Sequence, residues 1–295
     1  MRATISLLML VCLCSVTACG QDMSGDHHGN TPAAASPASD TTANQDWAKQ
    51  RLAKSPRHQE WVKVKNGTRE VSSFVVYPEN KNKATAVIVI HEIFGMTDWV
   101  QSLTDQLAEA GYVAIAPDLL SGMGPNGGGT SSLSGNAVGQ AIRDLPPDQI
   151  TADLNAVADY ISKVPAANGK IVVTGYCWGG SQSFRYATNN PNVKAAFVFY
   201  GSAPAAADGT PDKAALAKIK APVYGFYAGN DARINATLPK TTEAMTELKK
   251  TFEPVTYEGA GHGFMRAGEA PDANEANKKA RDDAWARWKK ILAGI

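Results

Sequence analysis

The chain has 295 residues, of which 44% are hydrophobic and 19% are charged, and its formal net charge at pH 7 is +1. Its 29 basic and 28 acidic residues form no basic stripe, so the sequence argues against a nucleic-acid-binding protein. The length is that of an N-terminal leader followed by one large α/β domain of roughly 250 residues.

The first predicted element is an export signal peptide at residues 1–18. A positive residue precedes an apolar run from Ile5 to Val16, which is too short for a membrane-spanning helix. The run ends at Val16-Thr-Ala-Cys19, which resembles a bacterial lipobox, so we expect cleavage before Cys19 and acylation of that cysteine. An ordinary secretory signal, with Cys19 as a bystander, is the alternative.

Acylation at Cys19 would anchor the protein in the bacterial cell envelope without a spanning helix. Because Gly20 and not Asp follows the cysteine, we expect the periplasmic side of the outer membrane if the organism is Gram-negative. Loss of the leader removes Cys12 and Cys14, so Cys177 remains as the only unmodified thiol. No intramolecular disulfide is then possible, and a lone thiol in an oxidising compartment favours a chemical role.

Residues 19–46 form the second predicted segment, a disordered tether. The segment is rich in Ala, Pro, Ser and Thr, a composition that cannot bury enough apolar surface to fold. The third segment, residues 47–295, is the predicted globular domain, because strand and helix patterns alternate along it.

The predicted strands of this domain are apolar runs bounded by turn residues, at Val71–Tyr77, Ala86–Ile90, Tyr112–Ala116, Lys170–Thr174, Ala195–Tyr200, Pro222–Ala228 and Pro254–Tyr257. Amphipathic spacing predicts helices at Asp98–Ala110, Pro147–Val164 and about Ala273–Leu292. Most of the runs lack alternation, which is typical of strands buried on both faces. The pattern predicts an α/β fold with a mostly parallel, doubly wound sheet flanked by helices, and ligands beyond the carboxyl ends of the strands.

A candidate nucleophile elbow follows the predicted strand Lys170–Thr174. The sequence there is Gly175-Tyr-Cys177-Trp-Gly-Gly180, and its glycines permit the strained strand-to-helix turn that lifts a nucleophile above the sheet edge. The nucleophile would be the thiol of Cys177. A cysteine after a buried strand can also be a small core residue, so this assignment depends on partners later in the chain.

Two such partners follow later predicted strands at the same sheet edge. Asp231 comes after Pro222–Ala228, and His262 comes after Pro254–Tyr257. The order Cys177, Asp231, His262 is the nucleophile, acid, histidine order of α/β-hydrolases. The thiolate would attack an acyl carbon, His262 would manage its proton, and Asp231 would orient the imidazole and stabilise its charged form.

From about Val71 to the C-terminus, the chain resembles the dienelactone hydrolase family of α/β-hydrolases. The resemblance is carried by four short motifs, which are Gly175–Gly180, the Gly-x-Asp at Asp231, the Gly-His-x-Phe at His262, and His91-Glu92-Ile93-Phe94-Gly95. It implies that the glutamate at Glu92 interacts with the resting cysteine and helps to form the thiolate when substrate binds. Without the resemblance, Glu92 could equally be a structural ion-pair partner.

The resemblance further implies an oxyanion hole made by the backbone N–H groups of Ile93 and Trp178. This agrees with the general hydrolase rule of one donor after the nucleophile and one from an earlier strand loop. Arg266 matches a family arginine that holds the substrate carboxylate, with a surface salt bridge as the alternative. The family's second such arginine has no counterpart in Leu120–Gly124, although Arg143 could replace it from the far side of the loop.

The segment Ser121–Gly135 is rich in Gly, Ser, Thr and Asn. It is not a phosphate-binding P-loop, because no Gly-Lys-Ser/Thr follows its glycines. We expect a mobile flap over the strand ends that shapes substrate choice.

The sequence as a whole predicts an exported lipoprotein that is a carboxylic ester hydrolase. We expect it to cleave an ester, lactone or thioester through an acyl-enzyme on Cys177. It predicts a small-molecule ester or lactone substrate, a membrane contact through the lipid anchor, and no metal or organic cofactor. Two alternatives remain: a non-catalytic envelope binding protein that retains the hydrolase scaffold, and a thiol-dependent amide or peptide hydrolase.

Overall fold

A computed structural model describes residues 45–295 of the chain. The expected signal peptide at 1–18, Cys19, and all but the last two residues of the expected tether at 19–46 lie outside the described residues. The first helix begins at Asp46, one residue before the expected domain start. The buried side chain of Gln45 accepts a hydrogen bond from the backbone N–H of Trp99 at 2.7 Å, so packing against the domain extends to Gln45.

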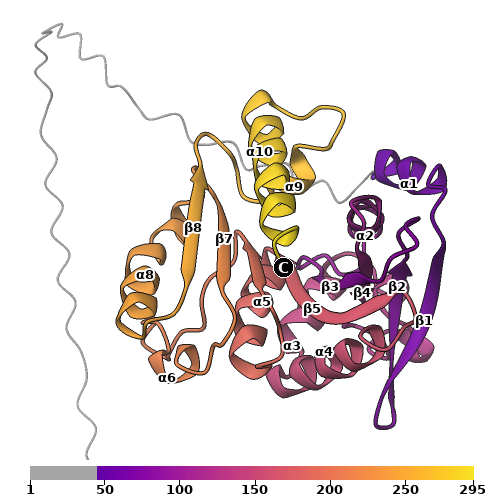
Figure 1. The fold of residues 1–295 in the computed structure, drawn as a ribbon, viewed down its shortest axis with the longest axis horizontal. Helices are drawn as coiled ribbons and strands as arrows, with labels where there is room; N and C mark the ends of the chain where they lie inside the picture. The colour runs from indigo at the N-terminus through magenta and orange to yellow at the C-terminus, as the bar shows by residue number, and fades with distance from the viewer. Residues whose placement is uncertain (1–44) are drawn as a thin grey trace, which may run out of the picture. The chain divides into compact units, whose positions relative to one another are not determined.

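One eight-stranded sheet runs through the domain, in the order β1-β2-β4-β3-β5-β6-β7-β8 (Figure 1). Its strands are β1 (Gln59–Asn66), β2 (Arg69–Val76), β3 (Ala84–Ile90), β4 (Val113–Pro117), β5 (Ala167–Tyr176), β6 (Ala196–Phe199), β7 (Val223–Ala228) and β8 (Phe252–Tyr257). β2 pairs antiparallel with β1 and β4, whereas β4, β3, β5, β6, β7 and β8 are mutually parallel. The predicted mostly parallel, doubly wound sheet is therefore confirmed.

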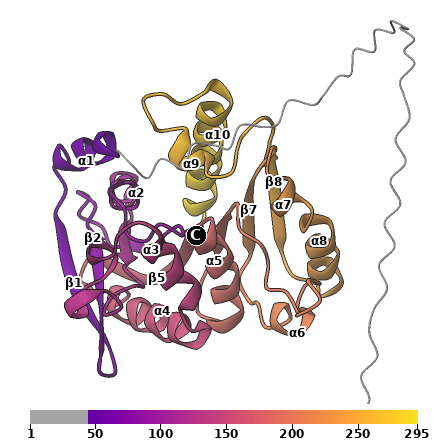
Figure 2. The same ribbon diagram turned by 180° about the vertical axis from the view of Figure 1, so that it is seen from behind.

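Helices cover both faces of the sheet, with α2 and α10 on one face and α4 and α5 on the other (Figures 1 and 2). The helices are α1 (Asp46–Ala53), α2 (Asp98–Glu109), α3 (Asn136–Asp144), α4 (Pro147–Ile161), α5 (Trp178–Asn189), α6 (Lys213–Leu216), α7 (Ala232–Asn235), α8 (Leu238–Glu247), α9 (Phe264–Ala267) and α10 (Glu275–Leu292). The three helices expected from amphipathic spacing are α2, α4 and α10, each present within three residues of the expected bounds.

The central strands are apolar throughout because both of their faces are buried. In β3, Ile88 packs into the core cluster that contains Leu154 of α4. Its neighbour Val87 points the opposite way, into the cluster that contains Trp99 of α2 and Trp288 of α10. Successive side chains of a strand point to opposite faces of the sheet, and here both faces are packed against a hydrophobic core. This explains the unbroken hydrophobic runs in the sequence.

The edge strand β1 has no counterpart among the sequence-predicted strands. It alternates exposed lysines with the half-buried Val62 and the buried Val64, and it joins β2 through a turn in which Gly67 has a φ of 60°. Asn66 and Arg69 are paired across this turn, so Gly67 and Thr68 form its two-residue loop, and glycine at the first loop position is the arrangement that a type II′ hairpin favours. Because β1 packs only one face, its sequence lacks the apolar run by which the central strands were recognised.

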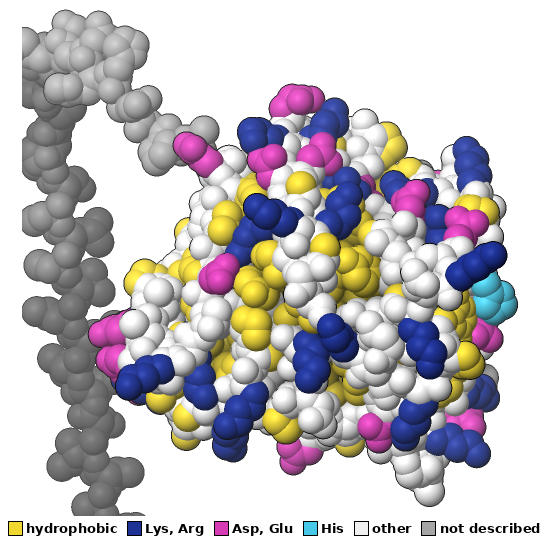
Figure 3. Space-filling view, in the orientation of Figure 1, with side chains coloured by type: hydrophobic (Ala, Val, Ile, Leu, Met, Phe, Trp, Pro, Cys, Tyr) yellow, Lys and Arg dark blue, Asp and Glu magenta, His cyan; other side chains and the backbone are white. Residues whose placement is uncertain are grey.

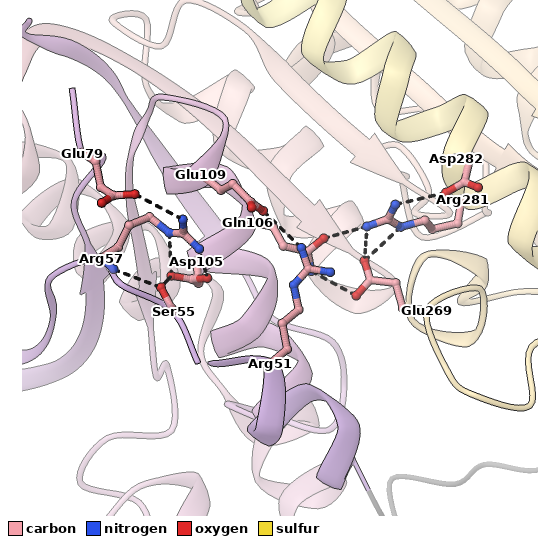
Figure 4. Close-up of polar contacts among 10 residues, drawn as sticks. All are labelled: Arg51, Ser55, Arg57, Glu79, Asp105, Gln106, Glu109, Glu269, Arg281 and Asp282. Carbon is pink, nitrogen blue, oxygen red and sulfur yellow. Dashed lines mark hydrogen bonds and ion pairs between the residues drawn. The ribbon is translucent and has the colours of Figure 1, made fainter. Parts of the chain in front are cut away.

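The loop between α9 and α10 is tied to α2 by a polar network (Figure 4). The guanidinium of Arg281 donates to Glu269 at 2.8 Å and to the side-chain oxygen of Gln106 at 2.6 Å. Gln106 in turn donates to the second oxygen of Glu269 at 3.0 Å. Each of these three side chains therefore has hydrogen-bond partners, and the network holds Glu269, two residues after the end of α9, in place.

Charges of both signs are interspersed on the face of the domain seen in Figure 3, in keeping with the near balance of acidic and basic residues. Among the helices of residues 45–295, none combines the length and the apolar character that crossing a membrane requires. The apolar export segment predicted from the sequence lies outside this range.

Candidate active site

Cys177 occupies a strained turn between β5 and α5. Its φ of 56° lies in the left-handed region, which non-glycine residues adopt rarely, and its backbone N–H donates to the carbonyl of Phe199 at 3.0 Å. A Cβ at Gly179 would lie 2.3 Å from the carbonyl oxygens of Ile90 and His91. A Cβ at Gly180 would lie 2.4 Å from the carbonyl oxygen of Phe199, so both positions require glycine. The predicted elbow is confirmed as a backbone feature, with a half-buried free thiol at its tip.

Asp231 and His262 come together at the same edge of the sheet. Asp231 follows β7 and caps α7, where one carboxylate oxygen accepts from the N–H of Ile234 at 3.3 Å. Its other oxygen lies 2.5 Å from Nδ1 of His262, in the loop that follows β8. Asn277 of α10 supports that loop by accepting from the N–H of Gly261 at 2.9 Å. The Asp–His pairing that the sequence suggested is thus present in the structure.

The electrostatics of this group favour a charged imidazole. Burial alone would lower the pKa of His262, but hydrogen bonds with Asp231 and Cys177 and the negative charges of both partners raise it to about 9. Burial would likewise raise the pKa of Asp231, and the hydrogen bond and charge of His262 outweigh this effect and lower it. His262 is therefore paired with Asp231, and Cys177 contributes to its raised pKa.

The segment after β3 lies against the elbow. Glu92 and Ile93 follow β3 in this segment, and Trp178 is the first residue of α5. The imidazole of His91 stacks on the indole of Trp178, with ring centroids 5.5 Å apart. The two residues that the family resemblance implied as oxyanion donors thus lie on two chain segments in direct contact.

Glu92 is almost fully buried and forms an ion pair with Arg266. Nε of Arg266 donates to the carboxylate of Glu92 at 2.8 Å, and its guanidinium lies over the ring of Phe94, 5.2 Å from the centroid. Sequence reasoning assigned Glu92 to the thiol and Arg266 to a substrate carboxylate, and the structure pairs the two with each other. Arg266 belongs to α9, directly after the His262 loop, so the pair joins the segment after β3 to that loop.

Tyr200 is a residue of this region that the sequence analysis placed at the end of a predicted strand and did not assign to the site. It is fully buried at the end of β6, with a φ of 41°, and its ring packs edge-on against the imidazole of His262 at 5.0 Å. Burial and the charge of Glu92 hold the pKa of its hydroxyl well above the usual value. Within residues 45–295 this hydroxyl has no hydrogen-bond partner. The signal in the sequence was its position at the carboxyl end of a predicted strand, the end at which the site residues lie.

The glycine-rich segment 121–135 is attached to the domain by Thr130. The Thr130 hydroxyl donates to one carboxylate oxygen of Asp118 at 2.7 Å, and its N–H donates to the other at 2.8 Å. The same hydroxyl accepts from the N–H of Met96 at 3.1 Å. The segment is thus held against the loop that carries Glu92. Arg143, considered above as a substitute carboxylate ligand, donates instead to Gln140 of its own helix α3.

Metal-binding arrangements were sought among the described residues 45–295. No group of three or more His, Cys, Asp or Glu side chains in that range lies close enough together to hold an ion. The site brings a free thiol, that of Cys177, to the same sheet edge as the His262–Asp231 pair, and these groups can carry out nucleophilic chemistry and proton transfer.

Several known proteins are similar to this chain. A protein from Saccharolobus solfataricus named "Putative carboxymethylenebutenolidase" is 31% identical over 258 residues, covering 77% of this chain and 95% of its own. One of the same name from Salmonella typhimurium is 34% identical over 208 residues, covering 68% and 74%. A crystal structure from Klebsiella pneumoniae, described as a "Putative Dienelactone Hydrolase", matches with a TM-score of 0.70 and 27% identity, over 81% of this chain and 99% of that one.

More distant structures share the fold alone, such as a dienelactone hydrolase-like phosphotriesterase from metagenomic libraries, with a TM-score of 0.68 at 18% identity. The family model described as "Dienelactone hydrolase family" matches residues 71–295, which include every residue of the site described above. With its α/β-hydrolase fold and its elbow, this chain belongs to the dienelactone hydrolase family.

Proposed function

We propose that this protein hydrolyses an ester, lactone or thioester through a covalent acyl intermediate on Cys177. The observation that carries the proposal is the 2.5 Å contact of Asp231 with His262, whose pKa both Asp231 and Cys177 raise. A raised pKa on His262 means that the imidazole holds a proton at neutral pH, which stabilises a thiolate beside it. A thiolate is intrinsically nucleophilic, so the proposed reaction requires no metal or organic cofactor.

In the acylation step, the sulfur of Cys177 bonds to the acyl carbon, and the carbonyl electron pair moves onto oxygen. When this intermediate collapses, the bond from carbon to the leaving oxygen or sulfur breaks, and the leaving group takes a proton from His262. Since Nδ1 of His262 faces Asp231 at 2.5 Å, the proton is delivered by Nε2. In the second step a water adds to the thioester, His262 accepts its proton, and the Cys177 thiolate leaves.

The negative oxygen of both intermediates needs preorganised donors. We propose the backbone N–H groups of Ile93 and Trp178 for this role, since their segments meet beside the elbow. Loss of one such donor would reduce turnover by on the order of 10²–10³-fold. Backbone donors cost no reorganisation during the reaction, because the surrounding structure already holds them in place.

Glu92 and Arg266 are proposed to respond to the substrate. The names of the relatives denote action on carboxymethylenebutenolide, a lactone that bears a carboxyl group. A substrate carboxylate would compete with Glu92 for the fork of Arg266, and the released Glu92 would then promote ionisation of the thiol. A substrate without a carboxylate would leave the Glu92–Arg266 pair intact, so we expect slower acylation with neutral esters.

The test is to mix the purified protein with a chromogenic short-chain ester and measure both the burst of released chromophore and the mass of the trapped protein. We expect a burst and an acyl adduct on Cys177, with both lost in Cys177→Ala. Ser183→Ala is the matched control, because Ser183 lies on the same helix and donates only to backbone carbonyls of the core. Hydrolysis that persists in Cys177→Ala would reject the nucleophile assignment.

The two alternatives are separate outcomes of this test. Turnover of an amide panel faster than the matched esters would indicate a thiol-dependent amide or peptide hydrolase. A folded protein with a reactive thiol but no turnover of esters, lactones, thioesters or amides would indicate a binding protein on a hydrolase scaffold.

We also propose that the protein is exported and acylated at Cys19, on the basis of the leader sequence alone. The anchored chain would then contact the membrane through its lipid. Growth of the expressing bacterium with labelled palmitate should label the wild type and leave Cys19→Ser unlabelled. Equal labelling of both would reject this site.

A further inference from the structure

His91, the first residue after β3, is a fully buried histidine outside the group of Cys177, His262 and Asp231. Its Nδ1 lies 2.8 Å from the backbone carbonyl oxygen of Glu92. The N–H of Leu119, in the loop after β4, donates to its Nε2 at a longer 3.4 Å. One imidazole therefore bridges the backbone of two neighbouring loops at the active edge of the sheet.

These partners determine the protonation state of the ring. A carbonyl oxygen can only accept, so Nδ1 of His91 must carry a hydrogen, and a backbone N–H can only donate, so Nε2 must be unprotonated. The ring is therefore the neutral Nδ1–H tautomer. Burial lowers the pKa of His91 despite the nearby charge of Asp118, which agrees with a neutral ring.

The hydrogen bond to Glu92 constrains the next N–H group. The carbonyl of Glu92 and the N–H of Ile93 belong to one planar trans peptide unit, so they point in opposite directions. A donor that holds this carbonyl therefore also sets the direction of the Ile93 N–H. If the peptide flipped, its carbonyl oxygen would point where the oxyanion donor is needed.

The Glu92 carbonyl has a second hydrogen-bond donor, which comes from within the Glu92–Gly95 turn itself. The N–H of Gly95 donates to the Glu92 carbonyl at 3.1 Å, which shapes the turn without attaching it to the elbow. His91 supplies that attachment, since its ring stacks on Trp178 with an interplanar angle of 17°. The backbone carbonyl of His91 also lies against Gly179, because a Cβ added at Gly179 would lie 2.3 Å from the His91 carbonyl oxygen. His91 is thus in contact with the segments of both proposed donors.

We propose that His91 is a positioning residue for the oxyanion hole, which holds the Glu92–Ile93 peptide in the orientation that directs the Ile93 N–H toward the acyl oxygen. The inference rests on the proposed hydrolase function. It concerns the stabilisation of the oxyanion and leaves the formation of the thiolate unchanged.

The experiment compares two substitutions of the same branched shape. His91→Asn keeps an N–H donor at the position of Nδ1, whereas His91→Leu removes it. Tyr186→Phe is the control for the loss of a buried ring-to-backbone hydrogen bond, since Tyr186 donates to the carbonyl of Leu154 on the other face of the sheet. Each variant is assayed for ester hydrolysis, for inhibition by a short aldehyde, and for alkylation by iodoacetamide.

The three assays distinguish a loss of oxyanion stabilisation from a loss of thiol reactivity. An aldehyde forms a hemithioacetal whose oxygen requires the hole, whereas alkylation by iodoacetamide requires only the thiolate. We expect His91→Leu to lower kcat at least tenfold with little change in KM, and to weaken aldehyde binding by a similar factor, as partial loss of a hole donor would. Alkylation should proceed at the wild-type rate. His91→Asn should recover much of the loss, and Tyr186→Phe should match the wild type.

Equal kcat and aldehyde affinity in His91→Leu and the wild type would overturn the inference while leaving the hydrolase proposal standing. Parallel losses in alkylation and hydrolysis would also overturn it, because they would indicate a general disturbance of the site. Absence of ester, lactone and thioester turnover in the wild type would reject the hydrolase proposal itself. In that case, unchanged aldehyde affinity in His91→Leu would still count separately against the role of His91.

Discussion

Glu92 and Arg266 form a buried ion pair between residues 174 positions apart in the chain, with Nε and a carboxylate oxygen separated by 2.8 Å. The side chain of Glu92 is 2% exposed and that of Arg266 is 15% exposed. Water therefore screens this pair far less than a surface pair, and removal of either partner takes from the other a charge that stabilises it inside the protein.

A double-mutant cycle measures this coupling. Glu92→Gln and Arg266→Met should each destabilise the protein, by about 3 kcal/mol for the loss of one partner of a buried pair. The double variant should be more stable than the sum of the two losses by about 1 kcal/mol or more, as measured by urea denaturation. The control is the exposed pair of Lys279 and Asp283 on α10, for which we expect about 0.3–0.5 kcal/mol. Additive losses at Glu92 and Arg266 would contradict the pairing.

The carboxylate of Asp231 should matter far more to turnover than to folding. Asp231→Asn removes the negative charge that stabilises the His262 imidazolium, and its amide can impose the wrong tautomer on the ring. We expect kcat to fall by on the order of 10³–10⁴-fold, by analogy with hydrolase triads. Asp212→Asn is the matched control, because Asp212 also caps a short helix, α6, and asparagine caps as well as aspartate. A similar loss of kcat in both variants would contradict the proposed role.

The raised pKa of His262 predicts a loss of stability at alkaline pH. Its pKa is about 9 in the folded protein and about 6.5 when unperturbed, so the folded state binds the proton more tightly. The resulting stabilisation is complete below pH 6.5 and disappears as the pH rises through 9. The free energy of unfolding should therefore decrease across this window in the wild type.

His262→Gln lacks the titrating group and isolates its contribution. The difference in unfolding free energy between wild type and variant, measured by urea denaturation at several pH values from 6 to 9.5, should shrink as the pH rises. A difference that is constant or grows with pH would show that His262 does not gain a proton on folding.

Thr130 should control the attachment of the segment 121–135. Thr130→Val keeps the shape of the side chain but removes its hydroxyl, so Asp118 loses one donor and the N–H of Met96 loses its acceptor. We expect a loss of about 1–3 kcal/mol in stability. We also expect faster proteolytic cleavage within the segment.

Limited proteolysis followed by mass spectrometry reads out both the rate and the site of cleavage. The comparison variant is Thr246→Val, which removes a hydroxyl that donates to the carbonyl of Thr242 on the exposed side of helix α8. Unchanged cleavage within 121–135 in Thr130→Val would mean that other contacts hold the segment.

Much of this protein followed from local sequence patterns. The buried strands were recognisable because burial on both faces demands unbroken apolar runs. The elbow was recognisable because the close approach of Gly179 and Gly180 to backbone oxygens tolerates no side chain. The positions of Asp231 and His262 after their strands followed in turn, because the carboxyl ends of parallel strands meet at one edge of the sheet. The edge strand β1 escaped notice because half of its surface faces water.

Only the tertiary structure decided which partners these residues have. The sequence left an ion pair open as the alternative for Glu92 and a salt bridge for Arg266. No spacing along the chain could reveal that these two residues pair with each other, because that depends on α9 lying against the segment after β3. The bridge from His91 to Leu119 and the attachment of Thr130 to Asp118 likewise join loops whose proximity depends on strand order. Sequence patterns indicate the local conformation and the burial of each residue. The packing of the sheet and its loops determines which residue becomes its hydrogen-bond or ion-pair partner.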